Sequence, residues 1–148
     1  MEMLNHHYLI TFALLLHQSY AMQYLVGDSI WTIPPMNNFY TNWSSSQVFI
    51  PGDTLYFDFD PELYNVMQVS RREYGLCTAD HPYKVYTDGP ANITLMEPGV
   101  FYYMCSILNY CALGQKLSVT VLQNYSSNTS PSLSPSPSPS PSPSPPPG

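Results

Sequence analysis

Apolar and polar residues alternate with a period of two in several short segments between residues 22 and 122. The clearest segment is "TLYFDF" at 54–59, where Leu55, Phe57 and Phe59 alternate with Tyr56 and Asp58. The last apolar run, "KLSVTVL" at 116–122, repeats the pattern. Such alternation predicts strands with one buried and one exposed face. Further strands are expected at "QYLV" (23–26), "QVFI" (47–50), "NVMQV" (65–69), "YKVY" (83–86), "NITL" (92–95) and "VFYYMC" (100–105).

Turn residues separate these segments, and no segment shows a sustained helical period. Pro51-Gly52-Asp53 and Glu97-Pro98-Gly99 are turn triplets. The stretch "SRREY" at 70–74 is expected to form one helical turn. About a hundred residues suffice for a single hydrophobic core. Seven to eight strands at this spacing predict an all-β domain, a Greek-key sandwich or barrel.

An apolar run near the N-terminus predicts export. The run "YLITFALLL" at 8–16 is too short to span a bilayer and matches the core of a signal peptide. Ser19 and Ala21 provide the small residues of a cleavage site. We therefore expect residues 1–21 to be a signal peptide and residues 22–122 to be the folded domain.

The composition changes abruptly near Gln123. Residues 123–148 end in "SPSPSPSPSPSPPPG", and such a segment is expected to be a disordered tail that favours polyproline II. The alternation of Ser and Pro resembles the glycosylation modules of plant arabinogalactan proteins, which implies a sugar-bearing stalk. No hydrophobic tail that would direct a glycosylphosphatidylinositol anchor is visible after it, which leaves two alternatives: release to the apoplast, or a sequence that is incomplete.

Charge and residue chemistry narrow the functional classes. Without residues 1–21 the chain has four basic and nine acidic residues, a net charge of −5. So few Lys and Arg residues exclude a basic patch that would bind nucleic acid. No later segment has the length and hydropathy of a transmembrane helix. A Ser–His–acid set and a glycine-rich phosphate loop are both missing, so we expect no enzymatic activity. The acidic residues Asp58, Asp60 and Glu62 are expected to lie on a solvated loop.

Four Asn-x-Ser/Thr sequons are candidates for N-glycosylation in an exported chain. Three are favoured: Asn42 in "NWS", Asn92 in "NIT" and Asn124 in "NYS". Asn128 in "NTS" is less favoured because Pro131 follows its triplet. These sites indicate a surface glycoprotein and specify no activity.

The chain has three cysteines, which allow three different single disulfides in an oxidising compartment. A Cys105–Cys111 bridge would close a small loop and would constrain the unfolded chain less than a bridge to Cys77. The spacing alone does not choose among the pairings. After removal of the signal peptide, His81 in "TADHPY" is the only histidine, and it is expected to be an exposed turn residue.

Four segments, in this order, resemble a plant phytocyanin domain. They are "YLVGDSIWTIPPMNNFYTNW", "PGDTLYFDFD", "YNVMQVSRREYGLCTAD" and "PGVFYYMCSILNYCALGQKLSVTVL". The resemblance covers nearly all of residues 22–122, and the Ser-Pro tail is similar to that of early nodulin-like and uclacyanin-type members. It implies a cupredoxin-like fold of seven to eight strands.

The resemblance also implies where a copper site would lie. Metal-binding phytocyanins use a His before an Asn-Val strand, a Cys, a second His and an axial Gln or Met. In this chain Cys105 takes the thiolate position and Gln115 the axial one, while the two histidine positions hold Tyr64 and Tyr110. Cys111 would then pair with Cys77. A blue copper centre takes two imidazoles, and tyrosine phenols are protonated near neutral pH, so no cofactor is expected.

We therefore expect a non-enzymatic phytocyanin with a degenerate copper site. Cys105 is expected to be a buried apolar residue, and Tyr64 and Tyr110 are expected to fill the copper cavity by stacking. The protein would be secreted to the apoplast, the cell wall or the outer face of the plasma membrane. Its role would be structural or in recognition, with a cell-wall carbohydrate or a cell-surface protein as partner. The alternative is a copper-binding electron-transfer protein of the blue copper type with an altered site.

Overall fold

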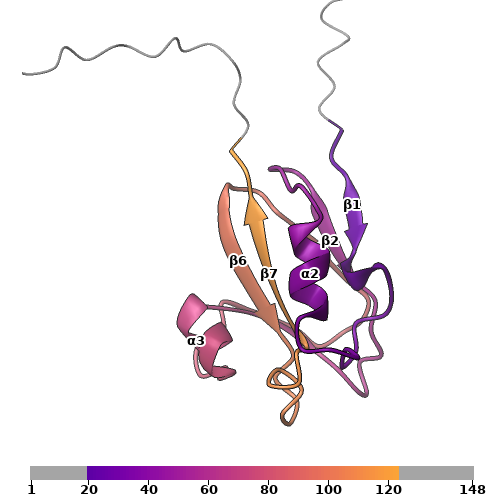
Figure 1. Ribbon diagram of the computed structural model, residues 1–148, viewed down its shortest axis with the longest axis vertical. Helices are drawn as coiled ribbons and strands as arrows, with labels where there is room; N and C mark the ends of the chain where they lie inside the picture. Colours follow the sequence, from indigo (N-terminus) through magenta and orange to yellow (C-terminus); the bar gives the residue numbers. More distant parts are fainter. Residues whose placement is uncertain (1–19, 124–148) are drawn as a thin grey trace, which may run out of the picture.

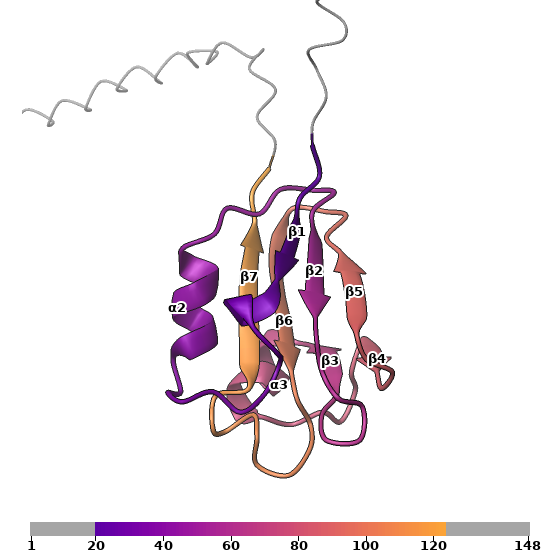
Figure 2. The same cartoon turned by 90° about the vertical axis from the view of Figure 1, so that its right-hand side faces the viewer.

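The computed structural model describes residues 20–123, which form a β sandwich of two sheets (Figures 1 and 2). The three-stranded sheet has the order β1 (Gln23–Leu25), β2 (Thr54–Phe57), β5 (Ala91–Thr94). The four-stranded sheet has the order β4 (Lys84–Tyr86), β3 (Val66–Val69), β6 (Gly99–Met104), β7 (Lys116–Val121). Strands β1 and β2 are parallel, and the other pairs within these sheets are antiparallel. Each of these strands overlaps a segment where one was expected, although β5 and β6 each begin one residue before the expected start.

The core lies between the two sheets and follows the period-two pattern. In β2, Leu55 and Phe57 are fully buried and alternate with half-buried Thr54 and Tyr56. Leu117, Val119 and Val121 of β7 face the same core. Burial of these side chains removes apolar surface from water and is the main force that holds the sheets together.

A helix that the sequence pattern did not predict, α2 (Phe39–Ser45), packs beside β7 (Figure 2). Tyr40 and Trp43 are one helical turn apart, so both side chains lie on the same face, and both are buried in the core. Tertiary burial of these two rings therefore stabilises a helix whose own sequence favours it only weakly.

The strand predicted at 47–50 is wrong. Within it only Phe49 forms a β-bridge, an isolated parallel one with Val121. The buried Asp53 carboxylate accepts hydrogen bonds from the N–H of Ile50 at 2.9 Å and from that of Met22 at 2.8 Å. Because a side chain satisfies these donors, the segment needs no sheet partner at this end.

Two short helical elements complete the described chain. The 3₁₀ turn η1 (Val26–Asp28) follows β1, and α3 (Arg71–Leu76) follows β3. A capping box begins α3: Ser70 Oγ accepts the N–H of Glu73, and the Glu73 carboxylate accepts the N–H of Ser70. The predicted helical turn at 70–74 thus extends to Leu76.

The described chain ends and the loop after β6 lie at opposite ends of the sandwich. The chain enters before β1 and leaves after β7 at one end, whereas residues 105–115 form the loop at the other end (Figures 1 and 2). No helix among residues 20–123 combines the length and hydropathy needed to cross a bilayer. The predicted signal peptide, apart from its last two residues, and the tail after Gln123 lie outside the described residues.

Candidate functional site

Tyr64 is placed at the loop end of the sandwich by a turn that precedes β3. Its N–H donates to the carbonyl of Asp60 at 2.9 Å, and the Asp60 carboxylate accepts the N–H of Glu62 at 2.9 Å. Asp60 and Glu62 are exposed, which agrees with the solvated loop expected for the acidic residues. The turn directs the chain into β3, with Tyr64 half-buried at its entrance.

Backbone hydrogen bonds close the loop between β6 and β7. The N–H of Cys105 donates to the carbonyl of Gln115 at 3.1 Å. The N–H of Gln115 donates to the carbonyl of Tyr110 at 3.0 Å. Gly114 has a φ of +101°, and a Cβ at this position would lie 2.7 Å from the Cα of Asn37. Only glycine fits this close approach, which fixes the loop against the segment before α2.

Asn65 connects this loop to the start of β3. Its Oδ1 accepts the N–H of Ser106 at 2.9 Å, and its Nδ2 donates to the Ser106 hydroxyl at 2.9 Å. Because two hydrogen bonds join the Asn65 amide to Ser106, they fix both the position and the orientation of Ser106 relative to Asn65. Tyr64 and Cys105, the neighbours of this pair, are therefore held at a fixed separation.

The structure brings Tyr64 and Tyr110 together. Their ring centroids are 5.8 Å apart with an interplanar angle of 56°, so the rings contact each other in a tilted arrangement rather than a parallel stack. The Thr32 hydroxyl donates to the Tyr64 hydroxyl at 2.7 Å, and the Tyr40 hydroxyl donates to the Thr32 carbonyl at 2.9 Å. Burial raises the pKa of Tyr40 to about 12, so it stays a neutral donor in this network.

Cys105 and Gln115 are both fully buried, and Cys105 belongs to the core cluster against which Tyr64 and Tyr110 pack. Burial raises the pKa of the Cys105 thiol, and hydrogen bonds from the backbone of Asn65 and Ile107 oppose this increase. The thiol is consequently protonated at neutral pH, which disfavours nucleophilic reactivity. Gln115 is unusual because neither Oε1 nor Nε2 of its side chain has a hydrogen-bond partner among the described residues.

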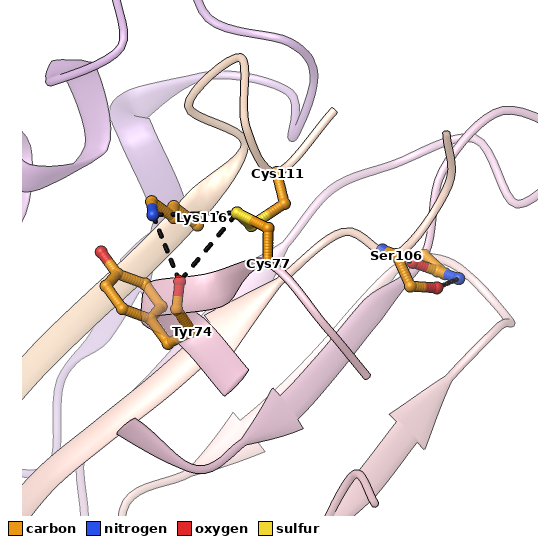
Figure 3. Close-up of a disulfide and its surroundings, with 6 residues drawn as sticks. Tyr74, Cys77, Ser106, Cys111 and Lys116 are labelled. Carbon is orange, nitrogen blue, oxygen red and sulfur yellow. Dashed lines mark hydrogen bonds between the residues drawn. A yellow bond between two sulfur atoms is a disulfide. The ribbon is translucent and has the colours of Figure 1, made fainter. Parts of the chain in front are cut away.

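A disulfide joins Cys77 at the end of α3 to Cys111 in the loop (Figure 3), which confirms the pairing that the resemblance implied. The bridge spans a sequence separation of 34 residues. Restricting the unfolded chain over such a separation stabilises the fold by about 4 kcal/mol. Lys116 covers the bridge: its Nζ lies 3.2 Å from the Tyr74 carbonyl and 4.7 Å from the centroid of the Tyr74 ring.

The comparisons with known proteins agree with this architecture. The profile of the plastocyanin-like domain matches residues 31–115. The chain belongs to the phytocyanin family. Cucumber stellacyanin, solved with Cu²⁺, is 30% identical in sequence, with a TM-score of 0.65 over 70% of this chain and 96% of that structure. This likeness confirms the cupredoxin-like fold expected from the sequence.

Curated relatives of this phytocyanin carry early nodulin-like and stellacyanin names. Early nodulin-like protein 9 of Arabidopsis thaliana is 33% identical over 81% of this chain and 60% of its own length. Stellacyanin of Toxicodendron vernicifluum is 35% identical over 66% of this chain and 94% of its own length. The chain spans only 53% to 62% of the length of the first three curated relatives, so a relative's whole-protein function does not transfer directly.

The side chains of this phytocyanin do not fit a blue copper centre. Such a centre takes two imidazoles and a thiolate with a weak axial ligand. Here the four positions offer two phenols, one buried thiol and one amide, and the Tyr64 hydroxyl is already hydrogen-bonded to Thr32. Among residues 20–123 no three His, Cys, Asp or Glu side chains are grouped closely enough to hold a metal ion.

The remaining predicted site residues are the glycosylation sites. Asn42 lies exposed in α2, and Asn92 lies exposed in β5, where its Oδ1 accepts a hydrogen bond from Gln23 Nε2 at 2.7 Å. Asn124 lies outside the described residues. Glycan attachment at these positions stays a prediction.

Sequence reasoning missed several residues that position the site. Thr32 and the Asn65–Ser106 pair carry no local motif, because their partners lie 32 and 41 positions away in the sequence. The capping box is different: Ser70 followed by Glu73 is a helix-start signature that could have been read directly from "SRRE".

Proposed function

We propose that this phytocyanin binds no copper and acts as a non-enzymatic recognition or structural glycoprotein outside the cell. The contact between Tyr64 and Tyr110 carries the proposal, because two phenol rings stand where the family resemblance places two imidazoles. The Tyr64 hydroxyl accepts a hydrogen bond from Thr32, and the buried Cys105 thiol is protonated. These features support a closely packed aromatic cluster, and no redox centre, at the loop end of the sandwich.

Export and glycosylation support the location of this role. The predicted signal peptide, the exposed Asn42 and Asn92 sequons and the Ser-Pro tail are all features of a secreted surface glycoprotein. The partner is a cell-wall carbohydrate or a cell-surface protein, and the site is the apoplast, the wall or the outer face of the plasma membrane.

A copper titration of the secreted chain tests the proposal. Added Cu(II) is expected to leave the protein colourless and without the electron paramagnetic resonance signal of a copper–thiolate centre. A stoichiometric, intensely blue product that cycles between oxidation states would refute it.

The second candidate is an electron carrier with an altered copper site. Cys105 and Gln115 occupy the thiolate and axial positions implied by the resemblance, and one related structure is titled "cucumber basic protein, a blue copper protein". The same titration separates the two candidates, because only the electron carrier acquires the blue band. Replacement of Cys105 by Ser would abolish that band and would leave a copper-free protein spectrally unchanged.

A further inference from the structure

Two cavities lie on either side of Tyr83, away from the Tyr64–Tyr110 pair. The larger, of about 440 Å³, is formed by α3 and the loop that follows it. The smaller, of about 210 Å³, lies between the edge strands β4 and β5, which Figure 2 shows on the same side of the sandwich. Tyr83 lines both cavities and is 67% exposed. We call the two cavities together the Tyr83 groove.

Hydrogen bonds fix the wall of the larger cavity before any ligand arrives. The Glu73 carboxylate accepts the backbone N–H of His81 at 2.8 Å and the Ser70 hydroxyl at 2.8 Å, so it joins the start of α3 to the loop. The disulfide at Cys77 anchors the end of α3. The N–H of Tyr83 donates to the carbonyl of Gln68 at 2.7 Å. A site organised in this way loses little conformational entropy on binding.

The groove has no excess of positive charge. The larger cavity is lined by Arg72 and by the carboxylates of Glu73 and Asp80, and Glu73 keeps its negative charge because its partners are a neutral hydroxyl and a backbone N–H. The smaller cavity is lined by Lys84 and Glu97. Such a groove has no net attraction for a phosphate, a nucleic acid or a polyanion. It offers hydrogen-bond donors and acceptors on both sides of one exposed aromatic ring.

We propose that the Tyr83 groove binds a linear, uncharged oligosaccharide. The ring of Tyr83 would pack against the C–H face of one sugar, and the sugars on either side would enter the two cavities. Arg72 would donate to sugar hydroxyls, and Asp80 would accept from them. This inference rests on the proposed recognition role and specifies the class of its ligand and the surface that binds it.

Calorimetric titration of the secreted chain with cellohexaose, xylohexaose and mannohexaose tests the inference. At least one of these neutral hexasaccharides is expected to bind, and hexagalacturonate is expected to bind at least tenfold more weakly. Tyr83→Ala should weaken the binding about tenfold or more, whereas Tyr83→Phe, which keeps the ring, should stay within about twofold of the wild-type affinity. Absence of binding by all three neutral sugars, or unchanged affinity in Tyr83→Ala, overturns the inference.

Two adjacent arginines provide a matched control. Arg71 and Arg72 are both exposed on the first turn of α3, but only Arg72 lines the cavity. Arg72→Gln should weaken binding severalfold, whereas Arg71→Gln, with the same change of charge, should have no effect. Equal losses in both variants would show a general charge effect and contradict the site. Copper measured on the same sample tests the proposed function separately, since a copper-free protein that binds no sugar refutes only the groove.

Discussion

The rings of Tyr64 and Tyr110 lie with their centroids 5.8 Å apart, and both pack against the core at the loop end of the sandwich. One ring comes from the turn before β3 and the other from the loop between β6 and β7, so the contact joins two segments that are distant in sequence. The two residues occupy both positions at which the family resemblance places imidazoles. Under the proposed copper-free function, this aromatic contact takes the place of a metal-mediated link between the two segments.

Removal of both rings should destabilise the domain. In Tyr64→Ala/Tyr110→Ala the two half-buried rings and the Thr32 hydrogen bond are lost, and the free energy of unfolding should fall by about 2–4 kcal/mol. Urea denaturation measures this change. Tyr83→Ala, at a 67% exposed ring, is the control and should change stability by less than about 0.5 kcal/mol. An unchanged denaturation midpoint in the double variant would show that the rings contribute no packing energy.

Restoring both imidazoles should restore copper binding. Tyr64→His/Tyr110→His would give two imidazoles beside the Cys105 thiol and the Gln115 amide, the ligand set of a blue copper centre. We expect an intense blue band on addition of Cu(II), and we expect either single substitution to give none. Adding Cys105→Ser to the double variant should remove the band. A colourless double variant that is correctly folded would mean that these residues are not the copper positions.

The unpartnered amide of Gln115 predicts that a less polar residue is more stable there. Within residues 20–123 its Oε1 and Nε2 are buried and have no hydrogen-bond partner, and an unsatisfied buried amide costs about 1–3 kcal/mol. Gln115→Met keeps the shape and removes both polar atoms, so the free energy of unfolding should rise by about 1–3 kcal/mol. Gln68→Met, at a half-buried position in β3, should change it little. A loss of stability in Gln115→Met would indicate that the amide has a partner in solution.

Glu73 should make the fold sensitive to acid. Hydrogen bonds from the His81 backbone, and then from Ser70, lower the pKa of Glu73 below its ordinary value of 4.5. Because the folded pKa is the lower one, the stabilisation is complete above the unfolded pKa and is lost as the pH falls through the folded pKa. The melting temperature should therefore decrease less steeply below pH 4.5 in Glu73→Gln than in the wild type. Glu62→Gln, at an exposed loop position, should keep the wild-type slope.

Alternation with a period of two predicted β2 and β7 most clearly, because each of these strands buries one face. The pattern is weaker in β1 and β4, whose residues are exposed or half-buried, although strands were expected in those segments too. The same reasoning failed at 47–50, where the side chain of Asp53 satisfies a backbone donor, and at α2, where the burial of Tyr40 and Trp43 overrides weak helix propensity. The first cause is a hydrogen bond between residues three apart and the second is tertiary burial, and neither leaves a periodicity in the sequence.

The candidate site was predictable in part. The family resemblance indicated the partners of the disulfide and the positions of Tyr64 and Tyr110. The hydrogen bonds that hold the two tyrosines in place follow no sequence motif, because they join residues more than 30 positions apart. They run from Thr32 to Tyr64 and between Asn65 and Ser106. The tilt of the rings depends on packing at short range, which composition and spacing do not determine.

Both described ends of the chain leave the sandwich on the side opposite to residues 105–115 (Figures 1 and 2). A surface tether joined directly to Tyr20 or Gln123, the two ends of the described chain, would therefore leave residues 105–115 at the far end of the sandwich. A domain immobilised in this way would present the end that carries the Tyr64–Tyr110 contact to the solution.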